Sequence, residues 1–77
     1  MDAIWEANVE IGQRIKQLRV MKGLTQEELA DRAELSKGFI SQVERDLTSP
    51  SIATLMDILQ CLGVSVSEFF TEEPEEQ

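Results

Sequence analysis

Hydrophobic residues recur along this chain at intervals of three and four, which is the spacing of one face of an α-helix. The first series predicts a helix that begins as early as Asp2 and ends at Lys22, because Gly23 can take the left-handed conformation that closes a helix. Trp5 and Val9 lie beside its apolar stripe, where they either pack on the domain's own surface or contact another subunit. The stripe consists of Ile4, Ile11, Ile15 and Leu18.

Two short helices follow, and each opens on a capping residue. Thr25 and Glu28 form an S/T-x-x-E capping box, so a helix is predicted to begin at Gln26. The small residues on its inner face let another helix approach closely. Ser36 caps the next helix, which is expected to run to about Arg45. The inner face of the first of these two helices is made of Leu29, Ala30 and Ala33.

The helix over residues 36–45 is expected to have one buried face and one exposed face. At about 100° per residue, a face that turns Ile40, Val43 and Leu47 inward leaves the polar residues on the outside. The outward face and its margins hold Lys37, Gly38, Phe39, Ser41, Gln42 and Arg45. Phe39 is interpreted as a packing residue at the edge of this face.

Two further helices complete the predicted architecture. Ser49 followed by Pro50 predicts an N-cap with proline at the first helical position, and Gly63 marks the end of that helix. Ser65 and Glu68 form a second capping box, which opens a short fifth helix. The buried face of the fourth helix is expected to contain Ile52, Leu55, Ile58, Leu59 and Leu62.

The whole pattern predicts one all-α domain, a compact bundle of five helices. Seventy-seven residues suffice for a single domain, and no alternating β-branched segment is present. Residues 1–10 are an N-terminal extension of the first helix, and residues 11–70 are the bundle. Residues 71–77, TEEPEEQ, have nothing apolar to bury and are interpreted as an acidic tail or linker.

Charge is distributed unevenly over a chain with a net charge of −8. All seven Lys and Arg residues lie between residues 11 and 50, together with six of the fifteen acidic residues. The remaining acids lie in the two flanking segments. A locally basic centre between acidic ends is compatible with a nucleic-acid partner, although the ends weaken long-range attraction to one.

Several classes of chemistry are not expected. With no His or Tyr and one cysteine, Cys61, the chain has neither a disulfide, nor a zinc-ligand set, nor a partnered catalytic nucleophile. Cys61 is interpreted as an inert packing residue. We therefore expect no enzyme activity, no metal and no cofactor. No signal peptide or membrane-spanning segment is predicted, so a cytoplasmic location is expected.

Between Ile11 and Phe70 the chain contains the segments LTQEELA, FISQVER and LGVSVSEFF. Through these segments it resembles the phage repressor and Cro type of helix-turn-helix domain, the XRE family. The resemblance implies a lambda-repressor-like fold whose recognition helix, about residues 36–45, enters the major groove. The implied function is transcriptional regulation by sequence-specific binding to a double-stranded DNA operator, as a homodimer on an inverted repeat.

Two segments, GFISQVER and TSPSIATL, are most similar to bacterial regulators that carry a C-terminal cupin sensor domain. A small-molecule effector would then act only through a C-terminal domain missing from this sequence. One alternative is a small stand-alone controller, such as a restriction-modification control protein or an antitoxin. Another is a protein-interaction bundle that does not bind DNA, which would explain the acidity more simply.

The resemblance also implies roles for residues of the recognition helix. Lys37 and Gln42 match base-reading positions, because Lys can donate to guanine and a Gln amide can pair with adenine. Gly38 lets the backbone come near the DNA, and Ser41 reaches a base edge or a phosphate. Lys37 and Arg45 have an ordinary alternative as solvated charges.

Phosphate contacts and one structural ion pair are implied in the same way. Gln26 matches a phosphate-binding residue at a helix N-terminus, and Arg45 supplies a phosphate contact at the far end of the recognition helix. Arg19 and Glu44 match an Arg–Glu pair of the phage repressors, so we expect a salt bridge between the first helix and the recognition helix.

The sequence departs from the family pattern at two corners. Glu34 and Asp46 stand where the family usually has Gly. A residue with a side chain in the left-handed conformation costs about 1 kcal/mol, so each corner is expected to be either strained or bent differently.

Overall fold

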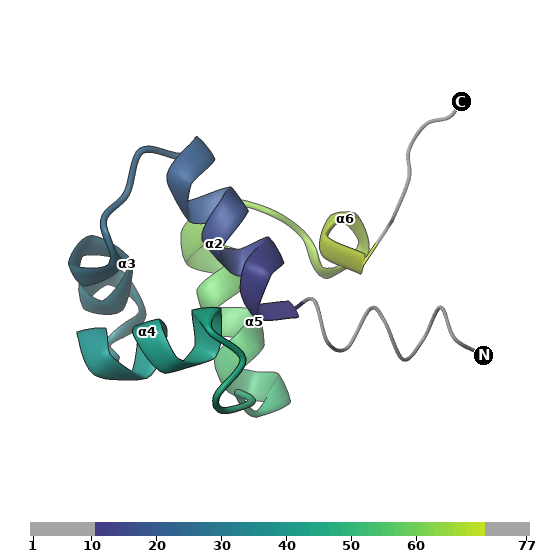
Figure 1. Ribbon diagram of the computed structural model, residues 1–77. Coiled ribbons are helices and arrows are strands. Elements are labelled where there is room, and N and C mark those ends of the chain that lie inside the picture. The colour runs from purple at the N-terminus through teal and green to yellow at the C-terminus, as the bar shows by residue number, and fades with distance from the viewer. Residues whose placement is uncertain (1–10, 71–77) are drawn as a thin grey trace.

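The computed structural model describes residues 11–70, which form five helices and no strand (Figure 1). The helices are α2 (Ile11–Met21), α3 (Gln26–Ala33), α4 (Lys37–Glu44), α5 (Ile52–Leu62) and α6 (Val66–Phe70). The predicted all-α class is confirmed for this part of the chain. The predicted N-terminal extension and the acidic tail lie outside the described residues.

Residues from all five helices meet in one hydrophobic core. α5 supplies the largest share of it, while α3 packs against both α4 and α5 and α2 packs against α4. Figure 1 shows α3 and α4 at one side of this arrangement and α6 at the other. The core consists of Ile15, Leu29, Ala30, Ile40, Val43, Leu55, Ile58, Leu59, Leu62 and Phe69. Cys61 is half-buried and packs against this core, as the sequence predicted.

Helix starts follow from the caps that the sequence predicts. The Thr25 hydroxyl accepts the Glu28 N–H at 3.0 Å, and the Glu28 carboxylate accepts the Thr25 N–H at 2.9 Å. Ser65 and Glu68 repeat both bonds at the start of α6. The Ser36 hydroxyl accepts the Phe39 N–H at 3.0 Å and opens α4. The predicted starts of α3, α4 and α6 are confirmed.

Glycines in the left-handed conformation close two of the helices. Gly23 has φ +74° and follows α2, which ends one residue before the predicted Lys22. Gly63 has φ +77° and caps α5. Both positions were predicted as helix ends because glycine adopts this conformation without a steric penalty.

The predicted N-cap of α5 was wrong by two residues. Ser51 rather than Ser49 caps the helix, since its hydroxyl accepts the Thr54 N–H at 3.1 Å and donates to the Thr54 hydroxyl at 2.9 Å. A cap at Ser49 would place Ile52 at the third helical position, where it offers no polar side chain. With Ser51 as the cap, Thr54 occupies the third helical position and offers a hydroxyl for a second hydrogen bond. Pro50 therefore precedes the cap instead of following it.

Two residues predicted to be buried are exposed. Leu47 is 66% exposed because α4 ends at Glu44, so the helical rotation that would have turned this side chain inward does not continue. Ile52 is 77% exposed because it is the first residue of α5, and the buried face of that helix starts only at Leu55.

Both corners without glycine adopt the left-handed conformation. Glu34, which caps α3, has φ +60°, and Asp46 has φ +60° as well. The corners therefore keep the geometry that glycine would give, at a cost of about 1 kcal/mol each. Asp46 recovers part of this cost, because its Oδ1 accepts the Gly12 N–H at 3.2 Å.

Gly12 lies where α2 meets the end of α4. A Cβ atom added at this position would overlap the backbone carbonyl of Val43 and lie 2.7 Å from Asp46 Oδ1. The backbone of α2 therefore touches the last turn of α4 without an intervening side chain. This close approach sets how α4 lies against α2. No helix within residues 11–70 is long and apolar enough to cross a membrane.

Candidate nucleic-acid interface

Helices α3 and α4 are joined by a tight corner of three residues. Glu34 turns the chain in the left-handed conformation, and the Leu35 N–H donates to the Ala30 carbonyl at 2.8 Å. Ser36 then starts α4. Two short helices linked in this way form a helix-turn-helix, in which the second helix is the one that reads DNA.

One face of α4 is polar and open to solvent. Ile40 and Val43 point into the core and are 0% and 1% exposed. The residues predicted for base reading lie on the remaining surface: Lys37, Gly38 and Gln42 are exposed, and Ser41 is half-buried. The structure brings these four residues together on one helix. Their contacts to bases stay a prediction.

Gly38 is not needed by the fold itself. A Cβ atom built at this position meets no atom within 4 Å, and the residue is exposed. Glycine in a helix is less favourable than alanine by up to about 1 kcal/mol. The absence of a side chain here therefore has no explanation within residues 11–70 of the protein.

Arg45 stands just past the end of α4. Its backbone N–H donates to the Ser41 carbonyl at 3.2 Å, and the residue is exposed. A guanidinium at this end of the helix can reach a phosphate on either side of a groove, because Arg is long and carries five N–H donors.

Arg19 and Glu44 form a nearly buried ion pair between α2 and α4. Arg19 Nε lies 2.6 Å from Glu44 Oε2, and Arg19 Nη2 lies 3.2 Å from Glu44 Oε1. The two side chains are 11% and 1% exposed. Arg19 Nη1 also donates to the Leu24 carbonyl at 2.8 Å, so the guanidinium holds the loop before α3 as well.

Gln26 joins this ion pair from the first turn of α3. Its Nε2 donates to Glu44 Oε1 at 3.0 Å. We call Arg19, Gln26 and Glu44 the buried polar cluster; it contains one side chain from each of three helices. The sequence suggested only a phosphate contact for Gln26, because its bond to Glu44 depends on how α4 is placed in the fold. The phosphate contact stays a prediction.

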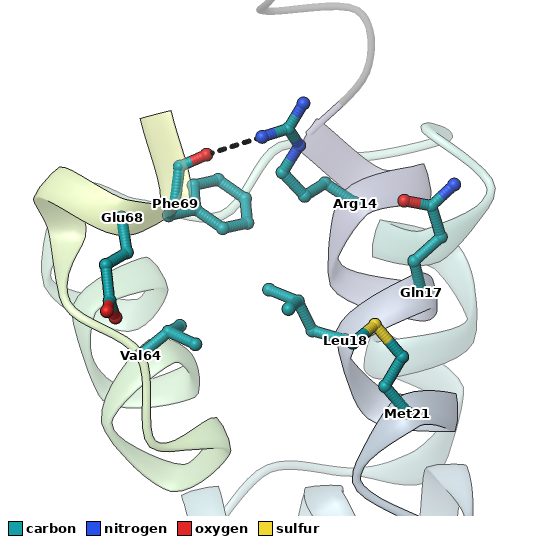
Figure 2. A pocket seen from close by; sticks show the side chains of 7 residues that line it. All are labelled: Arg14, Gln17, Leu18, Met21, Val64, Glu68 and Phe69. Carbon is teal, nitrogen blue, oxygen red and sulfur yellow. Dashed lines mark hydrogen bonds between the residues drawn. The ribbon is translucent and has the colours of Figure 1, made fainter. Parts of the chain in front are cut away.

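A separate open pocket lies between α2 and α6, away from α4 (Figure 2). Arg14 borders it, donating to the Phe69 carbonyl at 2.9 Å with its guanidinium 6.0 Å from the centre of the Phe69 ring. Arg14 thus anchors α6 on α2. The pocket measures about 310 Å³ and is also lined by Gln17, Leu18, Met21, Val64 and Glu68. It contains no residue of the polar face of α4.

Comparisons with known proteins agree with this geometry. The Helix-turn-helix family model HTH_3 matches residues 15–69. The immunity repressor protein of Bacillus phage phi105 is 43% identical over 63 residues, which are 82% of this chain and 44% of the repressor. The chain therefore spans less than half the length of that relative.

Solved structures of two DNA complexes are also similar. The restriction-modification controller protein C.Esp1396I, a tetramer in complex with its natural 35 base-pair operator, has a TM-score of 0.77 and 36% identity over 83% of this chain and 84% of its own. SinR, a master regulator for biofilm formation solved in complex with DNA, has a TM-score of 0.72 and 44% identity over 79% of this chain and 98% of its own. The chain therefore belongs to the XRE-type helix-turn-helix family.

Proposed function

We infer that this chain is the DNA-binding part of a transcriptional regulator, which recognises a specific double-stranded operator by placing α4 in the major groove. The polar face of α4 carries this inference, because a helix exposed along one side and anchored along the other fits the groove of B-DNA. The similar SinR and C.Esp1396I structures contain DNA and support it.

Base recognition is assigned to the exposed side chains of α4. Gln42 can donate to and accept from adenine N6 and N7 together, and Lys37 can donate to guanine O6 or N7. Ser41 is assigned a contact to a base edge or a phosphate. Gly38 gives the bases or the sugar–phosphate chain room next to the helix backbone, which accounts for a glycine that the fold does not need.

Phosphate contacts are assigned to the two ends of the motif. Arg45 supplies a charge beyond the last turn of α4. Gln26 lies at the first position of α3, where the backbone N–H groups of Gln26 and Glu27 have no helical partner. Two anchors of this kind would fix the register of α4 in the groove without reading sequence.

A homodimer fits the exposed apolar residues at the junction of α4 and α5. Leu47, Ile52 and Met56 are 66%, 77% and 51% exposed, and Ile52 and Met56 lie one turn apart on α5. We call these three residues the junction patch. A second copy that covers this patch is the proposed dimer contact. Two subunits that read an inverted repeat would hold their α4 helices about 34 Å apart.

A selection on random duplexes tests the proposed function. We expect recovery of an inverted repeat with half-site centres about one helical turn apart. Affinity should also fall steeply with salt, because only a phosphate-binding protein releases counterions. A protein-interaction bundle without DNA binding would show neither result, so the absence of both would overturn the inference.

The size of the complete regulator is a separate question with two candidates. The similarity of GFISQVER and TSPSIATL to cupin-linked regulators, and the 44% share of the phage repressor that is matched, favour a longer protein with an effector domain. The 84% share of the C.Esp1396I chain that is matched favours a small controller. Reading the source gene past codon 77 separates them.

A further inference from the structure

Building on the DNA binding inferred above, we propose that Glu44 is a positioning residue for the phosphate contact of Gln26. The buried carboxylate of Glu44 on α4 would orient the side chain of Gln26 on α3, which donates to a DNA phosphate. Sequence reasoning assigned the two residues to separate tasks, an ion pair and a phosphate contact. The structure joins them through Glu44 Oε1, which accepts from both Gln26 Nε2 and Arg19 Nη2.

The carboxylate fixes which end of the Gln26 amide faces inward. A carboxylate oxygen only accepts hydrogen bonds, so the amide nitrogen must face Glu44 and the amide oxygen cannot. The NH2 group carries two N–H bonds, and Glu44 uses one of them at 3.0 Å. The second N–H is left as a donor of fixed direction at the start of α3, where Gln26 is half-buried and still reachable from solvent.

This orientation matters because the first turn of α3 is acidic. Glu27 and Glu28 stand in that turn, so its net charge does not attract a phosphate. Binding there depends on hydrogen-bond donors in the right place rather than on a cation. Without Glu44, the Gln26 amide could rotate and would face the phosphate with its oxygen in part of the population. It would also lose more rotational freedom on binding DNA than an amide already held by Glu44, so affinity would fall.

Glu44 also ties the phosphate contact to the base-reading face. It belongs to α4 itself, and its partner Arg19 holds the Leu24 carbonyl just before α3. The phosphate donor on α3 and the polar face of α4 are therefore linked through a single side chain, in addition to the packing of the two helices. We expect the phosphate contact to disappear when Glu44 is replaced, even if all three helices remain in place.

The DNA affinity of four proteins at fixed salt tests this proposal: the wild type, Gln26→Ala, the pair variant Arg19→Met/Glu44→Met, and the triple variant that combines them. Replacing both members of a buried ion pair with apolar residues of similar volume often leaves stability unchanged or raised, so the pair variant should fold. Circular dichroism and urea unfolding check this. Gln17→Ala is a matched control, because Gln17 is an exposed glutamine of α2 outside the buried polar cluster.

The expected result is a shared loss of one phosphate contact. Affinity for every duplex at fixed salt should fall by about tenfold in Gln26→Ala, by the same factor in the pair variant, and by no more in the triple variant. Gln17→Ala should match the wild type. A folded pair variant with the wild-type affinity, in which Gln26→Ala still lowers the affinity, would overturn the positioning role while leaving the proposed function intact.

Side-chain amide NMR of Gln26 keeps the proposal testable if the pair variant does not fold. In the wild type, one of the two Nε2 protons should already be shifted by the bond to Glu44, and the other should shift when operator DNA is added. If neither proton responds to DNA that binds the protein, the positioning role is wrong. If no duplex binds the wild type, the proposed function fails together with this inference.

Discussion

Asp46 accepts a hydrogen bond from the backbone N–H of Gly12 across 3.2 Å and so joins the second residue after α4 to the first turn of α2. Asp46 holds this position in the left-handed conformation, with φ +60°. Gly12 can approach because it has no side chain. The contact explains why an aspartate stands at a corner where glycine is usual, since it adds a bond that glycine could not make.

Gly12→Ala should destabilise the domain. The new methyl group would overlap the Val43 carbonyl, so α2 or α4 must shift, at a cost of about 1 to 3 kcal/mol in the free energy of unfolding. Urea unfolding measures the change. Gly38→Ala is the matched control, because its methyl group meets no atom within 4 Å, and it should leave stability unchanged or slightly raised. Equal stability of the two variants would contradict the close approach of α2 and α4.

Replacing the two left-handed residues with glycine should give unequal results. Glu34→Gly removes backbone strain and should raise the free energy of unfolding by about 1 kcal/mol. Asp46→Gly removes the same strain but also the hydrogen bond to Gly12, which is itself worth about 1 kcal/mol, so stability should change little. Thermal or urea unfolding of both variants compares them directly. A gain of the same size in both would show that the Asp46 bond contributes nothing.

Glu44→Gln should lower the free energy of unfolding by about 3 kcal/mol. The Glu44 side chain is 1% exposed, so its replacement leaves the charge of Arg19 unpaired in a nearly buried site. Arg19→Met/Glu44→Met should lose much less, because neither charge then remains. Urea unfolding of the two variants separates these effects. A loss below about 0.5 kcal/mol in Glu44→Gln would mean that solvent reaches the pair, at the level of an ordinary surface ion pair.

Substitutions on the DNA-binding surface should separate sequence reading from backbone binding. Gln42→Ala should cost about 1 to 3 kcal/mol on the cognate site and relax the preference at one base pair in each half-site. Arg45→Ala should weaken binding to every duplex about equally. Gly38→Ala should weaken binding although the fold tolerates it. Titration of cognate and scrambled duplexes at fixed salt gives all three answers, and a sequence-dependent loss in Arg45→Ala would move that residue to the base-reading group.

Local signals in the sequence predicted the helices well. The capping boxes at Thr25 and Ser65 and the left-handed glycines at 23 and 63 depend only on neighbouring residues, and the structure has all of them. The error at the start of α5 came where two local signals compete. Ser49 and Ser51 can both cap a helix, but only Ser51 is followed three positions later by a threonine, Thr54, which bonds to it through both its backbone N–H and its hydroxyl.

Features that depend on contacts between distant segments could not be predicted from the sequence. The prediction that Leu47 points inward assumed that α4 continues past Glu44. In the structure α4 ends at Glu44, where the backbone of α2 packs against its last turn. The bond between Gln26 and Glu44 joins residues 18 positions apart and requires the corner between α3 and α4 to be in place. Gly12 carried no signal in the sequence, because a glycine with ordinary φ is required only by its neighbours in space.

The anchoring of α4 has a consequence for the DNA. Because the buried polar cluster and the contact at Gly12 hold this helix to its neighbours, it has little freedom to tilt toward an imperfect groove. The duplex must then bend or change its groove width to fit, and the energy of that deformation depends on base steps that no side chain touches. We expect operator preference to extend to the base pairs between the half-sites. Affinities for operators that differ only at those central steps measure this indirect readout, and equal affinities would show that the protein adapts instead.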